Sequence, residues 1–383
     1  MTDQKTARLI GGAPSENTAL YHRIRFLAGD PAAFIEKPDG QTLLLIRDIE
    51  ADRARKEALA DEVAIPADFE PAGGLSGDRA TATAQATAEC LKRLAADRVF
   101  VDRSTPYIYV HHLHEIGLDV GYDEAMGVVD RRSKSVDELH ALRNAQAATE
   151  EAMRKACELI ARSDVSSDGT LVHEGEPLTS ERVHVFIDIA LLEVGYDNPG
   201  SIVAGGPQAA DCHAHGSGVL RTGEPVIVDI FPSSKKTRYN GDCTRTVVHG
   251  TITDQIAAMH AAVVEAKAAG IAAVKAGATG EDVHRATIAV IKAHGFEVGM
   301  EPDDAPASWC GMVHGTGHGV GLNVHEPPLL DFKGAPLVAG DVLTVEPGLY
   351  SKAIGGIRVE DMVVVTSDGC ENFNQLPEGL DWS

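Results

Sequence analysis

The sequence is short of positive charge and lacks closely spaced cysteines. Lys and Arg number 34 against 57 Asp and Glu, which gives a formal net charge of −23. Nucleic acid is not an expected partner, because binding to a phosphate backbone depends on clustered Lys and Arg. The six cysteines include no CxxC pair, which fits reduced thiols in a cytosolic protein.

The first thirty residues lack a long apolar run. They interrupt short hydrophobic stretches with charged side chains such as Lys5, Arg8, Glu16 and Arg25. We therefore expect neither a signal peptide nor a membrane span, and a cytoplasmic location. The 383 residues are 44% hydrophobic and 24% charged, as in an ordinary globular protein of two or three domains.

The first part of the chain, residues 1–132, alternates short apolar runs with turn signals and predicts a small α/β domain. The run Pro38-Asp39-Gly40 indicates a β-hairpin turn. We also expect a helix at 80–96 and strands at 99–102 and 107–112. Three histidines lie close together here: His111, His112 and His114. No carboxylate or cysteine is expected at ligand spacing from them, which favours a surface or interface role over a metal site.

A polar linker, residues 130–137, precedes a second domain at 138–383, where a pattern of two helices and then strands occurs twice. The first copy has helices at 139–159 and from an N-cap at Ser180 to Glu193, then strands at 201–204, 225–231 and 244–249. The second has helices at 254–275 and from an N-cap at Thr279 to His294, then strands at 312–314, 342–346 and 358–366. The repeat predicts two related halves that share one core and supply ligands to a site between them.

Two aspartates stand out in the first half. Asp229 lies inside the apolar run Val-Ile-Val-Asp-Ile-Phe, where an ionised carboxylate is costly unless it is paired or bound to a cation. Asp242 begins the next strand, and a hairpin return could bring the two acids together. Taken alone, one could face solvent at a sheet edge and the other could be a turn residue.

The second half repeats this anomaly. Glu346 and Glu360 lie in runs that otherwise read as buried strands, and His318 lies in a glycine-rich stretch, Gly-Thr-Gly-His-Gly-Val-Gly. Two divalent ions at +4 would balance the four carboxylates at −4. This oxygen-rich set suits a two-metal hydrolytic site and favours Mn, Fe or Co over a thiolate-rich zinc site.

The order of these five residues, with the strings GDCTRT, HGTGHGVGLNVHE, TVEPGLY and GIRVED, resembles the pita-bread metallopeptidases. The likeness is to their Xaa-Pro aminopeptidase and prolidase branch, over residues 138–383. It implies an α+β protein whose C-terminal pita-bread fold has two related helix-helix-sheet halves. A smaller α/β domain, similar in size and hairpin content to the creatinase-like N-terminal domain, would precede it, and the chain would form a homodimer.

The resemblance also implies a role for each ligand. Asp229 would chelate one metal, His318 and Glu346 would hold the other, and the remaining two acids would bridge them: Asp242 and Glu360. The cofactor would be two divalent ions, manganese first, with cobalt, iron or zinc as alternatives. Glu346 would also act as general base for a hydroxide that bridges the metals.

Further residues are assigned by the same resemblance. His325 would stabilise the oxyanion of the tetrahedral intermediate. The family has a histidine ahead of its first aspartate, for which His213 is preferred and His215 is the alternative. His314 and Arg358 would line the substrate side, with Arg358 positioning Glu360 or a carboxylate. For both residues, a purely structural hydrogen bond is an equal alternative.

The activity implied is hydrolysis of Xaa-Pro bonds at peptide N-termini, so the expected partner is a proline-containing peptide and neither nucleic acid nor a membrane. The alternatives are an Xaa-Pro dipeptidase, a methionine aminopeptidase and a metal-free peptide-binding module. A dipeptidase must hold the free carboxylate after proline, for which the candidate cations are Lys333 and Arg358. Since Lys grips a carboxylate less definitely and Arg358 lies beside ligand Glu360, longer peptides are favoured.

Overall fold

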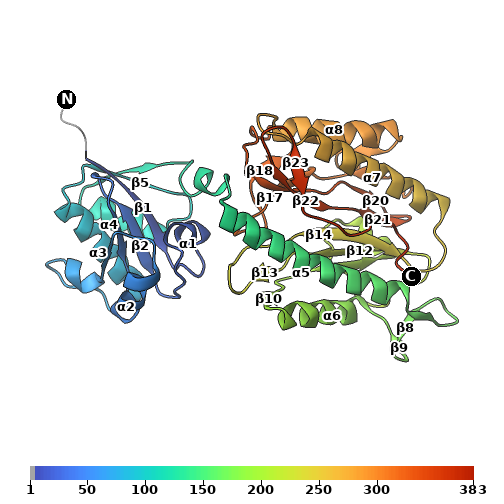
Figure 1. Cartoon of the computed structure of the whole chain (residues 1–383), viewed down its shortest axis with the longest axis horizontal. Coiled ribbons are helices and arrows are strands. Elements are labelled where there is room, and N and C mark those ends of the chain that lie inside the picture. The colour runs from blue at the N-terminus through green and yellow to red at the C-terminus, as the bar shows by residue number, and fades with distance from the viewer. Residues whose placement is uncertain (1–4) are drawn as a thin grey trace. The chain divides into compact units, whose positions relative to one another are not determined.

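The computed structural model describes residues 5–383, and the chain divides into two compact units, Met1–Arg131 and Arg132–Ser383. Figure 1 gives the elements of each unit, which we describe separately.

The first unit is built on a six-stranded sheet of order β4-β3-β2-β1-β5-β6. Its strands are β1 (Thr6–Gly12), β2 (Ala32–Glu36), β3 (Thr42–Leu45), β4 (Glu62–Ala64), β5 (Arg98–Val101) and β6 (Asp119–Tyr122). Its helices are α1 (Thr18–Ile24), α2 (Asp48–Glu57), α3 (Arg79–Arg93) and α4 (Tyr107–Glu115). Strands β2 and β3 are antiparallel, which confirms the expected hairpin; Gly40 supplies its left-handed turn residue at φ 85°.

Both faces of this sheet are buried. Along β2, Ala33 and Ile35 belong to one hydrophobic cluster, while Ala32 and Phe34 belong to another. Because successive side chains of a strand point to opposite faces, helices can cover the sheet on both sides. This is the α/β arrangement that the sequence predicts.

The strand expected at residues 107–112 is wrong, because this segment is the first part of helix α4. The helix begins directly after Pro106, and the buried side chains of Tyr109 and Leu113 lie four residues apart on one face. The Tyr109 hydroxyl donates to the carbonyl of Ala32 at 2.9 Å. Tertiary packing of these two residues therefore overrides the local preference of a Tyr- and Val-rich run for strand.

Helix α4 also corrects the interpretation of the three histidines. Oε2 of Glu115 lies 2.7 Å from Nδ1 of His112, and Oε1 lies 3.5 Å from Nε2 of His111. Residues three and four apart on a helix are neighbours, so a carboxylate does lie at ligand spacing. The contacts are those of a surface carboxylate shared by two imidazoles.

The second unit contains helices α5 (Val136–Ala161), α6 (Ser180–Glu193), α7 (Asp254–Ala273) and α8 (Gly280–Ala293). One sheet has the order β11-β12-β14, with strands Ile202–Gly205, Pro225–Ile230 and Cys243–Val248. A second, β15-β16-β20-β21, has strands Glu297–Val298, Gly311–Met312, Gly348–Ser351 and Gly355–Arg358. A third, β18-β17-β19-β22-β23, has strands Glu326–Leu330, Gly317–Gly319, Val342–Val345, Asp361–Val365 and Cys370–Asn372. Two small sheets are made of short strands. One has the order β7-β8-β9, with strands Asp164–Val165, Leu171–His173 and Glu176–Pro177, and the other pairs β10 (Tyr196–Asp197) with β13 (Ser233–Ser234).

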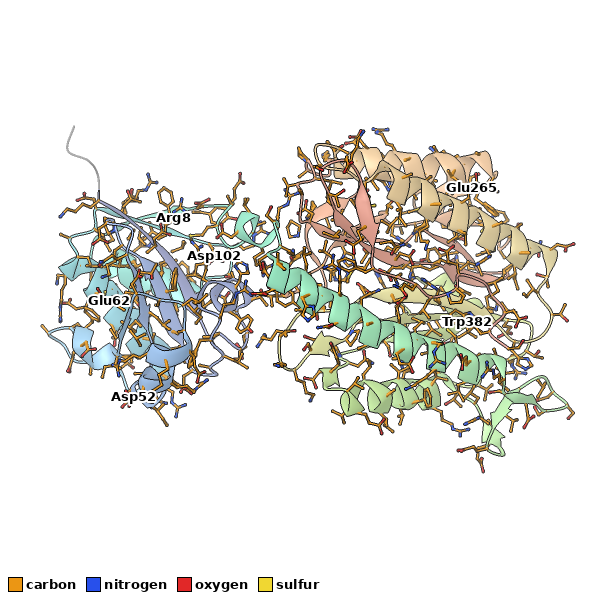
Figure 2. The ribbon with its side chains drawn as sticks, viewed as in Figure 1. Arg8, Asp52, Glu62, Asp102, Glu265 and Trp382 are labelled. Atoms are coloured by element: carbon orange, nitrogen blue, oxygen red, sulfur yellow. The ribbon has the colours of Figure 1, made fainter. Side chains whose placement is uncertain are left out.

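The two expected halves are present. Helices α5 and α6 contact the sheet of the first half, and α7 and α8 contact the sheets of the second. In Figure 1 the central strands of this unit, among them β12, β14, β20 and β21, lie between the two helix pairs. Trp382, labelled in Figure 2, is buried in the core cluster of the first half. The chain end therefore returns to pack on the beginning of the unit.

Helix ends follow capping chemistry closely. The side chain of Thr279 accepts from the backbone N–H of Asp282, which confirms it as the N-cap of α8. The N-cap of α6 is Thr179 and not Ser180, which is the first helical residue. Threonine and serine can both cap a helix. Thr179 is the cap here because its backbone is extended and its hydroxyl oxygen accepts from the backbone N–H of Arg182.

Helix α7 is the one helix in the described part of the chain that has the length and hydropathy to cross a membrane. Its residues Ile256, Met259 and Val263 are buried in the hydrophobic core of the second half. The helix contacts strands β19, β20 and β21 as well as helix α8. These contacts are those of a core helix.

Several strands of the second half differ from the sequence prediction. The strand expected at 358–366 is two strands, β21 and β22, which belong to different sheets. Strands β17, β18 and β20 have no counterpart in the prediction. Their sequences, such as Gly-His-Gly and Glu-Pro-Pro-Leu-Leu, are rich in glycine or proline and lack alternation, so pattern alone does not reveal them.

Candidate metal centre

The first half contributes two aspartates from one hairpin. Strand β12 pairs antiparallel with β14, and Asp229 lies opposite Thr244. Asp242 directly precedes β14, so the return of the chain brings it to the same end of the hairpin. The expected hairpin return is confirmed, and its cause is the antiparallel register.

The second half contributes three residues from one sheet. His318 lies in β17, Glu346 directly follows β19, and Glu360 directly precedes β22. Strand β19 pairs with both β17 and β22, which places the three side chains side by side. The break in the predicted strand 358–366 falls at Glu360, where the chain passes from one sheet to the other.

Thr244 joins the two halves. Its carbonyl accepts from the N–H of Glu360 at 3.1 Å, and its hydroxyl donates to Oε2 of Glu360 at 2.8 Å. A ligand of the second half is thereby fixed to β14, the strand that Asp242 directly precedes. Sequence reasoning missed Thr244, because its role depends on a residue more than a hundred positions away.

The five predicted ligands converge. Asp242, His318 and Glu360 each offer an atom within 4.8 Å of the others. Nε2 of His318 lies 3.3 Å from Oε1 of Glu346 and 3.7 Å from Oδ2 of Asp242. The Nδ1–H of His318 donates to the carbonyl of Gly319 at 3.1 Å, which directs the other nitrogen at the carboxylates.

Asp229 completes the set, and one of its oxygens is available to a cation. Arg358 Nη2 donates to its Oδ2 at 2.6 Å, while its Oδ1 is buried and makes no hydrogen bond to a described residue. A buried carboxylate oxygen beside other carboxylates is costly unless a cation binds it. Four carboxylates and one imidazole therefore fit two divalent ions.

The electrostatics of this cluster lead to the same requirement. Burial raises the pKa of Asp242 and of Glu360 well above the usual range, and the neighbouring carboxylates raise them further. Burial also raises the pKa of Glu346, but the hydrogen bond and charge of His318 outweigh it and hold that pKa at about 2. Without cations, some of the acids must keep their protons.

All five residues of the cluster line a cavity of about 480 Å³. Apolar side chains make much of the wall: Ile202, Phe231, Val324 and Leu329. Polar residues outside the ligand set also line it: Cys212, His213, His215, His314, His325 and Asp331. The cavity is large enough for a few residues of an extended peptide, with apolar surface beside the acids.

His314 is held in one state by its neighbours. Its Nδ1–H donates to the carbonyl of Gly315 at 2.7 Å, and its Nε2 accepts from the hydroxyl of Tyr350 at 2.7 Å. Burial lowers the pKa of His314, so the ring is neutral. Tyr350 in turn accepts from Arg358 Nη1 at 2.9 Å. A chain of hydrogen bonds thus runs from His314 to Arg358 and on to Asp229, through a tyrosine that sequence reasoning missed.

His325 is free to act on a substrate. Its ring centroid lies 4.1 Å from that of His318, and its imidazole makes no hydrogen bond to a residue that the structure describes. Burial lowers the pKa of His325, and so does the charge of His318. A neutral ring with an uncommitted N–H beside the ligands can donate to an oxygen that becomes negative.

Both candidates for the upstream histidine line the cavity. The ring of His215 is fixed, because its Nδ1–H donates to the carbonyl of Ser201 at 3.0 Å. The ring of His213 has no hydrogen bond to the described residues. Its backbone N–H is held by Asp211 at 3.0 Å, so His213 is the one that can turn toward a bound peptide.

The lining of the cavity includes an acid, Asp331, and does not include Lys333, the lysine considered as a partner for a substrate carboxylate. Lys333 is not among the lining residues, and its backbone N–H donates to Glu281 at 2.9 Å. Asp331 does line the cavity, with a side chain 45% exposed. Its nearest imidazole, His284 Nε2, lies 3.6 Å away, and burial lowers the pKa of that histidine. The charge of Asp331 is therefore not neutralised there.

Known proteins are similar to this chain in both sequence and fold. The model of metallopeptidase family M24 matches residues 140–367. The Xaa-Pro dipeptidase of Pyrococcus furiosus is 29% identical over 234 residues, which are 60% of this chain and 62% of that protein. Xaa-Pro aminopeptidase 1 of Streptomyces coelicolor is 34% identical over 215 residues, 49% of this chain and 42% of that protein. The matches thus span less than two thirds of these relatives.

A solved structure extends the likeness to the first unit. The Xaa-Pro dipeptidase from Bacillus anthracis superposes with a TM-score of 0.79 at 23% identity, covering 98% of this chain and 94% of that one. At this identity the likeness concerns the fold alone. It includes the N-terminal domain, which the family model does not reach.

Proposed function

This chain belongs to metallopeptidase family M24, and from that membership we propose that it hydrolyses Xaa-Pro bonds at the N-termini of peptides. The observation that carries the proposal is the convergence of His318, three buried carboxylates and the partly buried carboxylate of Glu346 on one cavity. The names of the relatives, an Xaa-Pro dipeptidase and an Xaa-Pro aminopeptidase, support this bond specificity.

Two divalent ions would be held by these five residues. Asp229 would serve one ion, His318 and Glu346 would serve the other, and Asp242 and Glu360 would serve both. When bound, such ions neutralise the acids, lower the pKa of water and polarise a carbonyl. Manganese is our first choice for an oxygen-rich set, with cobalt, iron and zinc as alternatives.

Two further residues handle protons and charge. Glu346 is ionised at neutral pH, because its contact with His318 outweighs burial and lowers its pKa. The role of accepting a proton from an attacking water is given to its carboxylate by the family resemblance and not by this pKa. His325 donates its free N–H to the carbonyl oxygen of the substrate as that oxygen becomes negative. His213 can add a second contact to the same peptide.

The cavity favours peptides longer than two residues. Arg358 is the one Lys or Arg among the described residues that line it, and its guanidinium is committed to Asp229 and Tyr350. Asp331 adds negative charge to the wall. A dipeptide would place its free carboxylate in this cavity without a cation to hold it, whereas a longer peptide places a neutral amide there.

The test is hydrolysis of matched peptides by manganese-loaded protein. We expect kcat/KM for Ala-Pro-Ala to exceed that for Ala-Pro, and no cleavage of Met-Ala-Ala. A tenfold preference for Ala-Pro would make the chain a dipeptidase. Cleavage of Met-Ala-Ala alone would make it a methionine aminopeptidase, and binding without cleavage of any peptide would point to a binding module.

A further inference from the structure

A buried ion pair joins the segment before helix α5 to the residue after His325. Lys134 Nζ lies 2.6 Å from Oε1 of Glu326, and the two side chains are only 3% and 2% exposed. Removing two charges from water is expensive, and well-packed apolar residues are often as stable or more so. Stability alone therefore does not explain why this buried ion pair is present.

Glu326 closes the turn that connects two site histidines, His318 and His325. It follows His325 directly, and its Cα partner across β17 and β18 is Gly319, the residue after His318. Its carboxylate packs against Gly321 so closely that a Cβ there would lie 2.4 Å from Oε1. Anchoring this carboxylate fixes both ends of the turn, and each end carries a functional imidazole.

The same turn is tied to the strand hairpin of the first half. The carbonyl of Gly321 accepts from the backbone N–H of Asn240 at 3.0 Å and from its side-chain amide at 2.8 Å. Asn240 lies two residues before Asp242. A displacement of the turn would therefore disturb ligands from both halves.

The segment that carries Lys134 contacts two more parts of the site. Arg132 forms an ion pair of 2.5 Å with Asp341, which directly precedes β19 and thus the strand leading to Glu346. Glu138 accepts from the hydroxyl of Tyr239 at 2.5 Å, beside Asn240. Residues 132–138 thus contact three segments that carry or adjoin metal ligands, and both side chains of the pair at Lys134 are buried.

We propose that Lys134 is a positioning residue for the metal centre: through Glu326 it holds the turn 319–326 so that His318 and His325 keep their working geometry. A displacement of about 1 Å at a catalytic group can cost about a hundredfold in rate. A charged pair has directional contacts at fixed places, which apolar packing does not reproduce. The kinetic part of the test rests on the proposed peptidase activity.

The test compares Lys134→Met with the double variant Lys134→Met/Glu326→Met. The single variant removes the lysine that pairs with this buried carboxylate, so we expect it to lose thermal stability and to lower kcat by about tenfold or more. The double variant replaces both charges by side chains of similar length, so its melting temperature should recover. If Lys134 positions the site, kcat stays low in the double variant with KM changed less than threefold.

Recovery of wild-type kcat together with stability in the double variant would overturn the proposal, because the pair would then be structural only. The matched control is Lys37→Met in the first unit. It breaks another pair with a buried lysine, Lys37 and Glu62 at 2.8 Å, and should leave kcat unchanged.

Manganese titration of the same variants by calorimetry gives a readout that needs no substrate. Groups that orient metal ligands typically contribute about 10–100-fold to metal affinity, so we expect the double variant to bind manganese at least tenfold more weakly. If no Xaa-Pro peptide is cleaved by the wild type, the proposed function fails while this titration still decides the role of Lys134. Unchanged affinity in a stable double variant with wild-type turnover, or with no turnover to compare, contradicts it.

Discussion

Arg358 donates a hydrogen bond of 2.6 Å to Asp229, and both residues are buried. The arginine therefore serves an acid of the metal centre and is not free to bind a substrate carboxylate. Burial by itself lowers the pKa of Arg358, but Tyr350 and the acids around the guanidinium raise that pKa well above its usual range. It is a permanent positive charge in the wall of an acidic site.

Removing the Tyr350 hydroxyl should weaken this arrangement. Tyr350→Phe leaves His314 Nε2 without a partner and leaves Arg358 Nη1 with only the carbonyl of Cys212 at 3.2 Å. A buried polar group left unpaired costs about 1–3 kcal/mol. We expect a loss of that size in urea unfolding and a fall in kcat. Tyr109→Phe, which removes a buried hydroxyl bonded to Ala32 in the first unit, should lower stability with kcat intact. Equal kinetics for both variants would show that the Tyr350 hydroxyl has no role in catalysis.

Metal stoichiometry tests the bridging assignment. Elemental analysis after dialysis should find two divalent ions per chain in the wild type. Asp242→Ala or Glu360→Ala should bind neither ion, because each of these carboxylates is assigned to both. A variant that retains one ion tightly would move its carboxylate to a terminal position.

Metal binding should release protons and strengthen with pH. The metal-free site holds extra protons, because burial raises the pKa of Asp242 and Glu360. The folded state then binds more protons than the unfolded state above pH about 4, the ordinary pKa of these acids, so its stability falls as pH rises through the raised values. Metal replaces the protons and reverses the trend. Calorimetry in two buffers of different ionisation enthalpy measures the release, and zero release at pH 7 would contradict this account.

His325→Ala should lower turnover while metal content stays at the wild-type level. The ring contacts a ligand imidazole but is assigned to the developing oxyanion, and one such donor is typically worth about 10²–10³ in kcat. Turnover and elemental analysis are measured on the same preparation. Loss of metal in this variant would make His325 a ligand.

Reversing the charge at Asp331 should change the length preference. Asp331→Arg supplies the missing cation, so the ratio of kcat/KM for Ala-Pro to that for Ala-Pro-Ala should rise by about tenfold; the effect is moderate because an exposed pair is screened by solvent. Asp331→Asn should give a smaller rise, and 0.5 M salt should reduce both. Lys333→Ala serves as the control and should change nothing. A ratio unaffected by Asp331→Arg would place the prolyl carboxylate elsewhere.

The sequence predicts the general architecture where local patterns are strong. Helical periodicity and capping residues reveal the long helices of the second unit, and the hairpin around Gly40 follows from its turn chemistry. The errors occur where tertiary packing decides. Helix α4 forms because Tyr109 and Leu113 pack into the hydrophobic core of the first unit. Strands β17 and β18 form because these glycine- and proline-rich segments pair with each other, and β17 also pairs with β19.

By itself, the sequence determined which acidic residues need a cation to balance their buried charge. An acid within an apolar strand is costly wherever that strand lies, so Asp229, Glu346 and Glu360 could be recognised one by one. Only the tertiary structure decided which groups serve them. Lys134 meets Glu326 across 192 positions, and Arg358 meets Asp229 across 129. A single sequence does not encode such pairings as a local pattern, because they exist only once two sheets have packed around the same cavity.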